Sequence, residues 1–143
     1  MSERTWLPDP VVPVAEHRRL DVRVASGAVH ATLVRRRAAS PVRRAVLYVH
    51  GWIDYFFQAH LSQAWAAAGW DFYAIDLHAY GRSLDDGERP NYCAGFAEYH
   101  AELDAAIDVI AHEDGHERVV LLGHSTGGLL AVQAPVGWTS AQI

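Results

Sequence analysis

A serine flanked by small residues lies near the end of the chain, where residues 123–128 read Gly-His-Ser-Thr-Gly-Gly with the hydroxyl at Ser125. The stretch directly follows an apolar run typical of a buried strand and directly precedes an apolar run typical of a helix. A serine on such a sharp turn needs small neighbours because the backbone is closely packed there. The pattern predicts a nucleophile for acyl transfer; the alternative is a glycine-rich turn whose serine only caps a helix. The residues that would support the turn are Gly123, His124, Gly127 and Gly128.

A second turn, His50-Gly51-Trp52, directly follows the apolar run Ala45–Val49. A turn at that place can direct a backbone N–H toward the oxyanion that forms when a serine attacks a carbonyl. We expect the amides of Trp52 and Thr126 to be the two donors, with His50 and Gly51 supporting the loop. Taken alone, the motif would be an ordinary turn after a strand.

A third loop, residues 76–83, reads Asp-Leu-His-Ala-Tyr-Gly-Arg-Ser and follows an apolar run that ends at Ile75. We interpret it as a structural loop rather than a catalytic one. Asp76 is expected to accept hydrogen bonds from the backbone or from Arg82, and so to hold the loop beside the site.

The elements that position these loops follow a regular order. Two alternating segments separated by Ser26-Gly27 predict a β-hairpin, and the remainder alternates strand with helix, which predicts a parallel sheet with helices on its faces. The predicted strands are Arg18–Ala25, Val29–Val34, Ala45–Val49, Trp70–Ile75 and Val119–Leu122, and the predicted helices are Phe56–Ala68, Phe96–Ile110 and Leu129–Ala134.

Together the three motifs resemble the α/β-hydrolase superfamily, and residues 50–58 with the Gly-His-Ser-Thr-Gly-Gly turn resemble its serine aminopeptidase-like and monoacylglycerol-lipase-like branch. The resemblance covers about Ala15 to Val132. It implies a partial α/β-hydrolase fold, with a mostly parallel sheet, an N-terminal β-hairpin and flanking helices. We divide the chain into an extended lead-in (1–15), the N-terminal half of an α/β-hydrolase domain (16–134) and a tail without the resemblance (135–143).

The resemblance implies a serine hydrolase that acts on carboxylic ester or amide bonds through an acyl-enzyme, with a small apolar ester or amide as substrate. In this superfamily the nucleophile is followed along the chain by an acid and then by a histidine. Only 18 residues follow Ser125, and they contain no Asp, Glu or His. We therefore expect an impaired enzyme. The alternatives are a non-catalytic truncated or frameshifted product and a fragment completed by another chain.

The remaining histidines offer no evident base. His124 neighbours the serine, but adjacent side chains on such a turn diverge. His50 is expected to brace its own loop, and His78 lies on a loop at the carboxyl ends of the strands, where ligands bind in such sheets. The other six are interpreted as surface or core positions: His17, His30, His60, His100, His112 and His116.

Composition excludes several classes of protein. The 143 residues suit one domain, and the net charge of −5 disfavours nucleic acid as a partner. No spacing of His and Cys recurs, so the sequence predicts no metal site and no cofactor. With no apolar run long enough for a signal peptide or a membrane span, we expect a cytoplasmic protein. An apolar strand left unpaired at the sheet edge would favour self-association.

Overall fold

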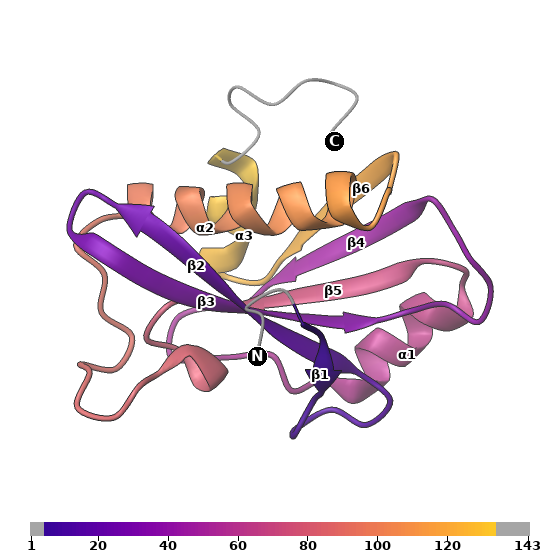
Figure 1. Cartoon of the computed structure of the whole chain (residues 1–143), viewed down its shortest axis with the longest axis horizontal. Coiled ribbons are helices and arrows are strands. Elements are labelled where there is room, and N and C mark those ends of the chain that lie inside the picture. Colours follow the sequence, from indigo (N-terminus) through magenta and orange to yellow (C-terminus); the bar gives the residue numbers. More distant parts are fainter. Residues whose placement is uncertain (1–4, 134–143) are drawn as a thin grey trace.

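A six-stranded sheet forms the centre of the molecule (Figure 1). The computed structural model describes residues 5–133, so the predicted tail, 135–143, lies outside the described residues. Across the sheet the strands follow the order β1-β2-β3-β5-β4-β6. Their bounds are β1 Leu7–Pro8, β2 Glu16–Val24, β3 Gly27–Arg36, β4 Arg44–Val49, β5 Asp71–Asp76 and β6 Arg118–Gly123.

The direction of the strands agrees only in part with the expectation of a mostly parallel sheet. The predicted hairpin is present as the antiparallel pair β2 and β3, and β4 is parallel to both β5 and β6, as predicted. However, β1 pairs antiparallel with β2, and β3 pairs antiparallel with β5. The sheet is therefore mixed, because the hairpin continues the sheet beside β5 instead of lying apart from it.

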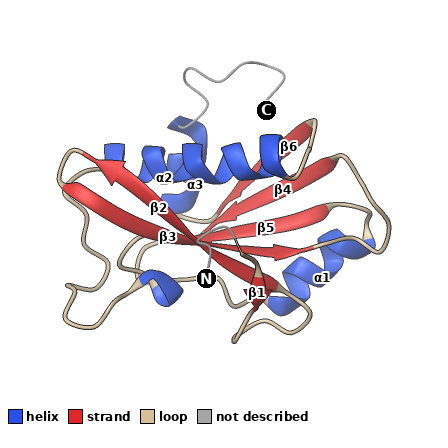
Figure 2. Ribbon diagram, viewed as in Figure 1, coloured by secondary structure: helices blue, strands red, loops and turns tan. Residues whose placement is uncertain are grey.

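Helices cover both faces of the sheet, as Figure 2 shows. The helices are α1 Ala59–Ala67, α2 Phe96–Asp108 and α3 Thr126–Gln133. In the view of Figure 1, α2 and α3 lie above the sheet and α1 lies below it. A π-helical turn, Val109–Glu113, continues α2 beyond the predicted end at Ile110.

Two predicted helix starts are wrong by three residues. The helix predicted from Phe56 begins at Ala59, because the Phe56 amide donates to Asp76 Oδ1 (2.8 Å) and its carbonyl accepts from Arg82 Nη1 (2.7 Å). These bonds hold Phe56 in the loop. The helix predicted from Leu129 begins at Thr126, directly after Ser125, since the glycines that were assigned to the turn form its first turn.

Each face of the sheet has its own core. Leu47 and Val49 of β4 pack on the side of α2 and α3, whereas Val46 and Tyr48 pack on the side of α1. Successive side chains of a strand point to opposite faces, so a strand covered on both sides needs a continuous apolar run. The run Ala45–Val49 is accordingly buried along its whole length, and it fixes where the loop at His50 emerges.

Residues 7–8 of the lead-in form the short strand β1 at the edge of the sheet, and residues 10–14 bend and turn before β2. Val12 from this segment is fully buried in the core on the α1 side. None of the helices within residues 5–133 combines the length and apolar character that crossing a bilayer requires.

Candidate active site

Ser125 occupies a strained turn between β6 and α3. Its φ is +56°, a left-handed conformation that non-glycine residues rarely adopt and that costs about 1–3 kcal/mol. The His124 amide still donates to the carbonyl of Val49 (3.0 Å), so the β4–β6 pairing continues to the residue before the serine. The chain then turns directly into α3. The serine is thus placed at the carboxyl end of the edge strand β6 and at the N-terminus of a helix.

The glycines around the turn allow it to approach β4. A Cβ on Gly127 would collide with the carbonyl oxygens of Val49 and His50. A Cβ on Gly51 would lie 3.2 Å from Ser125 Cβ and 3.3 Å from His124 Nδ1. The loop after β4 and the turn after β6 are therefore in direct contact, which brings together two motifs that are more than 70 residues apart in the sequence.

The two amides expected at the oxyanion lie on these touching segments. Trp52 is in the turn directly after Gly51, and Thr126 is the first residue of α3. The first N–H groups of a helix have no partner inside the helix, so the Thr126 amide is available to an anion. The Trp52 side chain is 67% exposed, so its packing does little to fix its amide.

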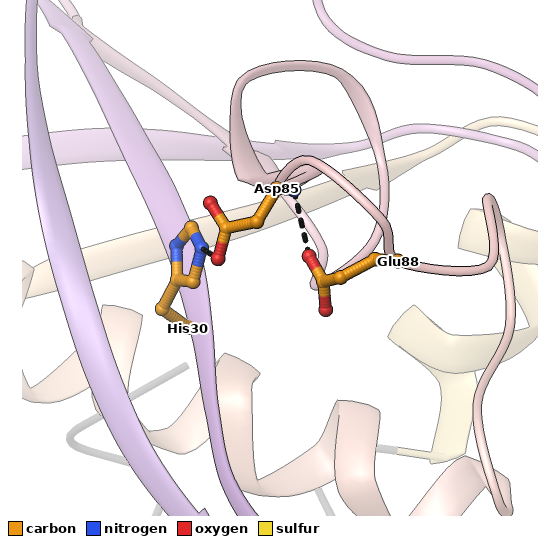
Figure 3. A group of neighbouring side chains, drawn as sticks. All are labelled: His30, Asp85 and Glu88. Atoms are coloured by element: carbon orange, nitrogen blue, oxygen red, sulfur yellow. Dashed lines mark hydrogen bonds and ion pairs between the residues drawn. The ribbon is translucent and has the colours of Figure 1, made fainter.

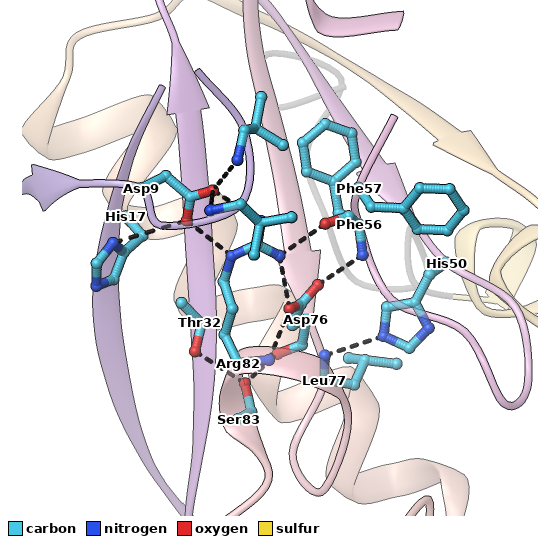
Figure 4. Close-up of polar contacts among 12 residues, drawn as sticks. Asp9, His17, Thr32, His50, Phe56, Phe57, Asp76, Leu77, Arg82 and Ser83 are labelled. Carbon is cyan, nitrogen blue, oxygen red and sulfur yellow. Dashed lines mark hydrogen bonds and ion pairs between the residues drawn. The ribbon is translucent and has the colours of Figure 1, made fainter. Parts of the chain in front are cut away.

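A buried ion-pair network holds the loop after β4 from behind (Figure 4). Asp76 accepts from the Phe56 amide on one oxygen, and from the Arg82 amide and Arg82 Nη1 on the other, at 2.8–3.0 Å. Arg82 also donates through Nε and Nη2 to both oxygens of Asp9 (2.7 and 2.8 Å). Asp76 thus accepts hydrogen bonds from the backbone and from Arg82, and the fork geometry of arginine is what allows one side chain to join three segments.

The lead-in supplies a member of this network that the sequence pattern did not reveal. Asp9 also accepts from the amides of Val11 and Val12 and has no exposed side-chain surface. Burial opposes its ionisation, but the hydrogen bonds and charge of Arg82 and the two amides hold the Asp9 pKa below its usual value. A single aspartate between prolines carries no periodic signal, so only the fold shows its partner.

His50 connects its own loop to the loop after β5, and both of its ring nitrogens are engaged, so it is not placed to act as a base. Its Nε2 accepts from the Leu77 amide at 3.1 Å (Figure 4). Its Nδ1 lies 2.8 Å from the Gly51 carbonyl. These partners require a neutral ring with the proton on Nδ1. Burial, only partly opposed by Gly51, Asp76 and Asp54, lowers the pKa of His50, which favours the same neutral form.

The other histidines of interest have different surroundings. His78 is buried against Glu102, with its amide 2.6 Å and its Nδ1 2.5 Å from the two carboxylate oxygens. His124 is exposed, and its Nδ1 lies 4.0 Å from Asp54 Oδ2. His116 is buried between the Ile110 carbonyl and Asp71, consistent with a core position. Of these, only His124 lies on the turn that carries Ser125.

Comparison with known proteins identifies the relatives of this site. The sequence model of the family described as "Serine aminopeptidase, S33" matches residues 40–138. That range contains the turn at Gly51, the Asp76 loop and Ser125. No curated protein matches the chain in sequence.

Solved structures with the same fold include several hydrolases. A probable hydrolytic enzyme from Pseudomonas aeruginosa PAO1 aligns with a TM-score of 0.71 and 21% identity over 91% of this chain and 39% of its own. An epoxide hydrolase from an endophytic Streptomyces aligns at 0.57 and 28% over 86% and 33%. An acetyl xylan esterase from Paenibacillus sp. R4 aligns at 0.62 and 20% over 96% and 49%. The chain thus spans a third to a half of the length of these structures.

Proposed function

The chain belongs to the serine aminopeptidase (S33) family of α/β-hydrolases, and from this premise we propose that it carries the nucleophile half of a serine hydrolase site. The reaction would be the cleavage of a carboxylic ester or amide bond through an acyl-enzyme. The observation that supports this most directly is Ser125, held at positive φ between strand and helix and in contact with the loop at Gly51.

In the proposed reaction, Ser125 Oγ attacks the substrate carbonyl carbon and its proton passes to a base. The amides of Trp52 and Thr126 stabilise the negative oxygen of the tetrahedral intermediate. Collapse of the intermediate expels the alcohol or amine, which takes up the proton, and leaves the acyl group on the serine. Water then releases the acid and restores the hydroxyl.

A small apolar substrate agrees with the surface beside the serine. The loop after β4 exposes large apolar side chains, and α3 contributes another; they are Trp52, Ile53, Tyr55, Phe57 and Leu129, each at least 38% exposed. Apolar walls with few polar groups are typical of small-molecule sites. We propose that these side chains contact the acyl or leaving group.

The base is the part of the mechanism that residues 1–143 do not provide in the family order. Residues 126–143 contain no Asp, Glu or His. Both ring nitrogens of His50 are engaged, and His78 is paired with Glu102, so His124 beside Asp54 is the histidine to test first. Because triad members act as a unit, we expect weak hydrolysis, about a thousandfold or somewhat more above water from the oxyanion amides and binding alone.

The decisive experiment measures ester hydrolysis that depends on Ser125. The purified chain is assayed with p-nitrophenyl butyrate, with and without added imidazole as an external base, beside Ser125→Ala and His124→Ala. The proposal predicts a low rate that imidazole raises in the original chain more than in Ser125→Ala, together with slow labelling by a fluorophosphonate. Equal rates and no labelling in both proteins would refute it and favour the non-catalytic alternative. Fast turnover lost in His124→Ala would show that the base lies within the chain.

A further inference from the structure

Three potential metal ligands from two distant segments meet on the side of the sheet that carries the hairpin. His30 lies on β3, and Asp85 and Glu88 lie on the loop that follows the Arg82 network (Figure 3). We propose that these three side chains bind a divalent transition-metal ion of the zinc type. The sequence predicted no metal site because the histidine and the nearer carboxylate are 55 residues apart.

The geometry already approaches that of a coordination site. His30 Nε2 lies 2.8 Å from Asp85 Oδ2, and one ligand atom from each of the three residues lies within 4.8 Å of the others. Around a tetrahedral ion with bonds near 2.1 Å, neighbouring ligand atoms are about 3.4 Å apart. The His30–Asp85 spacing is shorter than that value, so these two side chains would move apart to admit an ion between them and Glu88.

One ligand is rigid and the other two are accessible. His30 is 8% exposed and is fixed on a paired strand, whereas Asp85 and Glu88 are exposed to solvent. Glu88 is also oriented, because its Oε1 accepts from the Asp85 amide at 2.7 Å. A buried anchor with solvent-facing carboxylates gives an ion both a fixed position and an entry path, and leaves room for water in the remaining coordination positions.

The charge balance favours a cation at this place. The two carboxylates approach each other beside a histidine. The three arginines that line the same cavity pair with other acids: Arg82 with Asp9 and Asp76, Arg18 with Glu113, and Arg19 with Asp21. Arg89, next in sequence to Glu88, lies over the ring of Tyr92. A bound dication would compensate the two negative charges without disturbing these pairs.

The ligand types indicate the class of ion. One imidazole nitrogen with two carboxylate oxygens suits zinc, manganese or iron(II), while magnesium and calcium prefer sites built from oxygen alone. The site is separated from the nucleophile by β5 and β4, so an ion here would not touch the reacting atoms. It would instead tie the loop after Ser83 to β3, next to the network that supports the loop at Phe56.

The test titrates the purified chain with Zn²⁺ by calorimetry and with Co²⁺ by visible absorption, which reports coordination directly. Glu88→Gln and Asp85→Asn change exposed side chains and should preserve the fold. Asp86→Asn is the matched control for an exposed carboxylate, and His112→Gln removes a histidine outside the site that also pairs with a carboxylate, Asp108.

The proposal predicts one Zn²⁺ per chain, at least tenfold weaker binding in Glu88→Gln and in Asp85→Asn, and unchanged binding in both controls. Mg²⁺ and Ca²⁺ should not displace the Co²⁺ signal at millimolar concentration. The proposal is overturned if the original chain binds no Zn²⁺, if the two ligand variants bind as tightly as the original, or if His112→Gln abolishes binding. A circular dichroism spectrum of each variant separates loss of the site from loss of the fold.

Discussion

The two sides of the candidate active site are built differently. Behind the loop after β4, Asp9, Asp76 and Arg82 are almost fully buried, and every charged oxygen of the two acids has a donor. In front, Ser125 and the residues of its turn face a surface on which Trp52 and Ile53 are each 67% exposed. The buried network is held by many internal contacts, whereas the residues around Ser125 are held by few.

The two sides also differ in whether their contacts close within residues 5–133. The supporting network closes among segments that are all present between Asp9 and Ser83. The outer edge of β6, by contrast, has no strand beside it within residues 5–133. Variants in the buried network should therefore change the stability of the fold. Variants at the turn of Ser125 or at the edge of β6 should change reactivity or association.

Removing Arg82 should have the largest effect on stability. Arg82→Ala leaves Asp9 and Asp76 buried without their main partner, and breaking a buried pair in this way costs about 3–5 kcal/mol. This is comparable with the whole stability of a small domain. Urea unfolding followed by tryptophan fluorescence should show a lost or strongly shifted transition.

The matched control is Arg89→Ala, which removes an exposed arginine that lies over Tyr92. Its unfolding midpoint should remain within experimental error of that of the original chain. If both variants unfolded at the same urea concentration as the original, the network of Asp9, Asp76 and Arg82 would not contribute to the stability of the fold.

Disrupting the contact between the loop after β4 and the turn at Ser125 should cause the next largest loss of stability. In Gly127→Ala the new Cβ meets the carbonyls of Val49 and His50, which are backbone atoms that cannot rotate away. We expect a loss of about 1–3 kcal/mol, as is typical of overpacking. The turn at Ser125 would also move away from the loop at Gly51, so fluorophosphonate labelling should slow.

Gly128→Ala is the control, because the nearest atom to its Cβ, the carbonyl oxygen of Gly123, lies at an ordinary 3.5 Å. Alanine favours a helix by up to about 1 kcal/mol over glycine, so this variant should be neutral or more stable. A destabilisation equal to that of Gly127→Ala would mean that α3, rather than its contact with β4, limits the fold.

Much of this architecture could be predicted from the sequence. Apolar runs and helical spacing predicted the strands β2 to β6 and the helix α2, since both patterns record burial directly, whereas the short strand β1 was not predicted. The same patterns contain no information on strand direction, so the antiparallel pairing of β3 with β5 was missed. The order of the motifs indicated the contact between the loops, and the glycines, which permit close approach, were its signal.

Contacts made by single side chains could not be predicted. Asp9 reaches Arg82 across 73 residues, and His30 reaches Asp85 across 55, without any local pattern. Phe96 shows the reverse case, because this apolar residue begins the predicted and observed helix α2 but is 41% exposed. Such positions depend on tertiary packing, which overrides periodicity at the ends of elements.

The exposed edge of the sheet gives a smaller effect, on association. We propose that chains pair through β6, whose Val120, Leu121 and Leu122 are only half buried. Leu121→Lys places a charge at that edge while the lysine stem covers the same apolar surface. Sedimentation velocity should show concentration-dependent dimers that dissociate about tenfold more readily in the variant. A monomer at all concentrations in the original chain would contradict the proposal.

The smallest predicted effect is a dependence of the free energy of unfolding on pH. It is caused by the buried pair His78 and Glu102. Burial opposes the charge of His78, but the hydrogen bond and charge of Glu102, with Glu98 and Glu88 nearby, raise the His78 pKa above 6.5. Burial is also the main cause that raises the pKa of Glu102, although His78 opposes it. Both shifts mean that the folded pair holds a proton that the unfolded chain releases more readily.

The sign of the effect follows from this linkage. The stability contributed by charged His78 is fully present below about pH 6.5 and is lost as the pH rises through its raised folded pKa. The pKa of His50 is lowered, so its change of protonation affects the free energy of unfolding only below about pH 6.5. The free energy of unfolding, measured with urea between pH 6.5 and 8.5, should fall with pH in the original chain and fall less in the double variant His78→Gln/Glu102→Gln. His112→Gln, which changes an exposed pair, should keep the original slope, and identical slopes in all three proteins would show that the buried pair does not exchange its proton on unfolding.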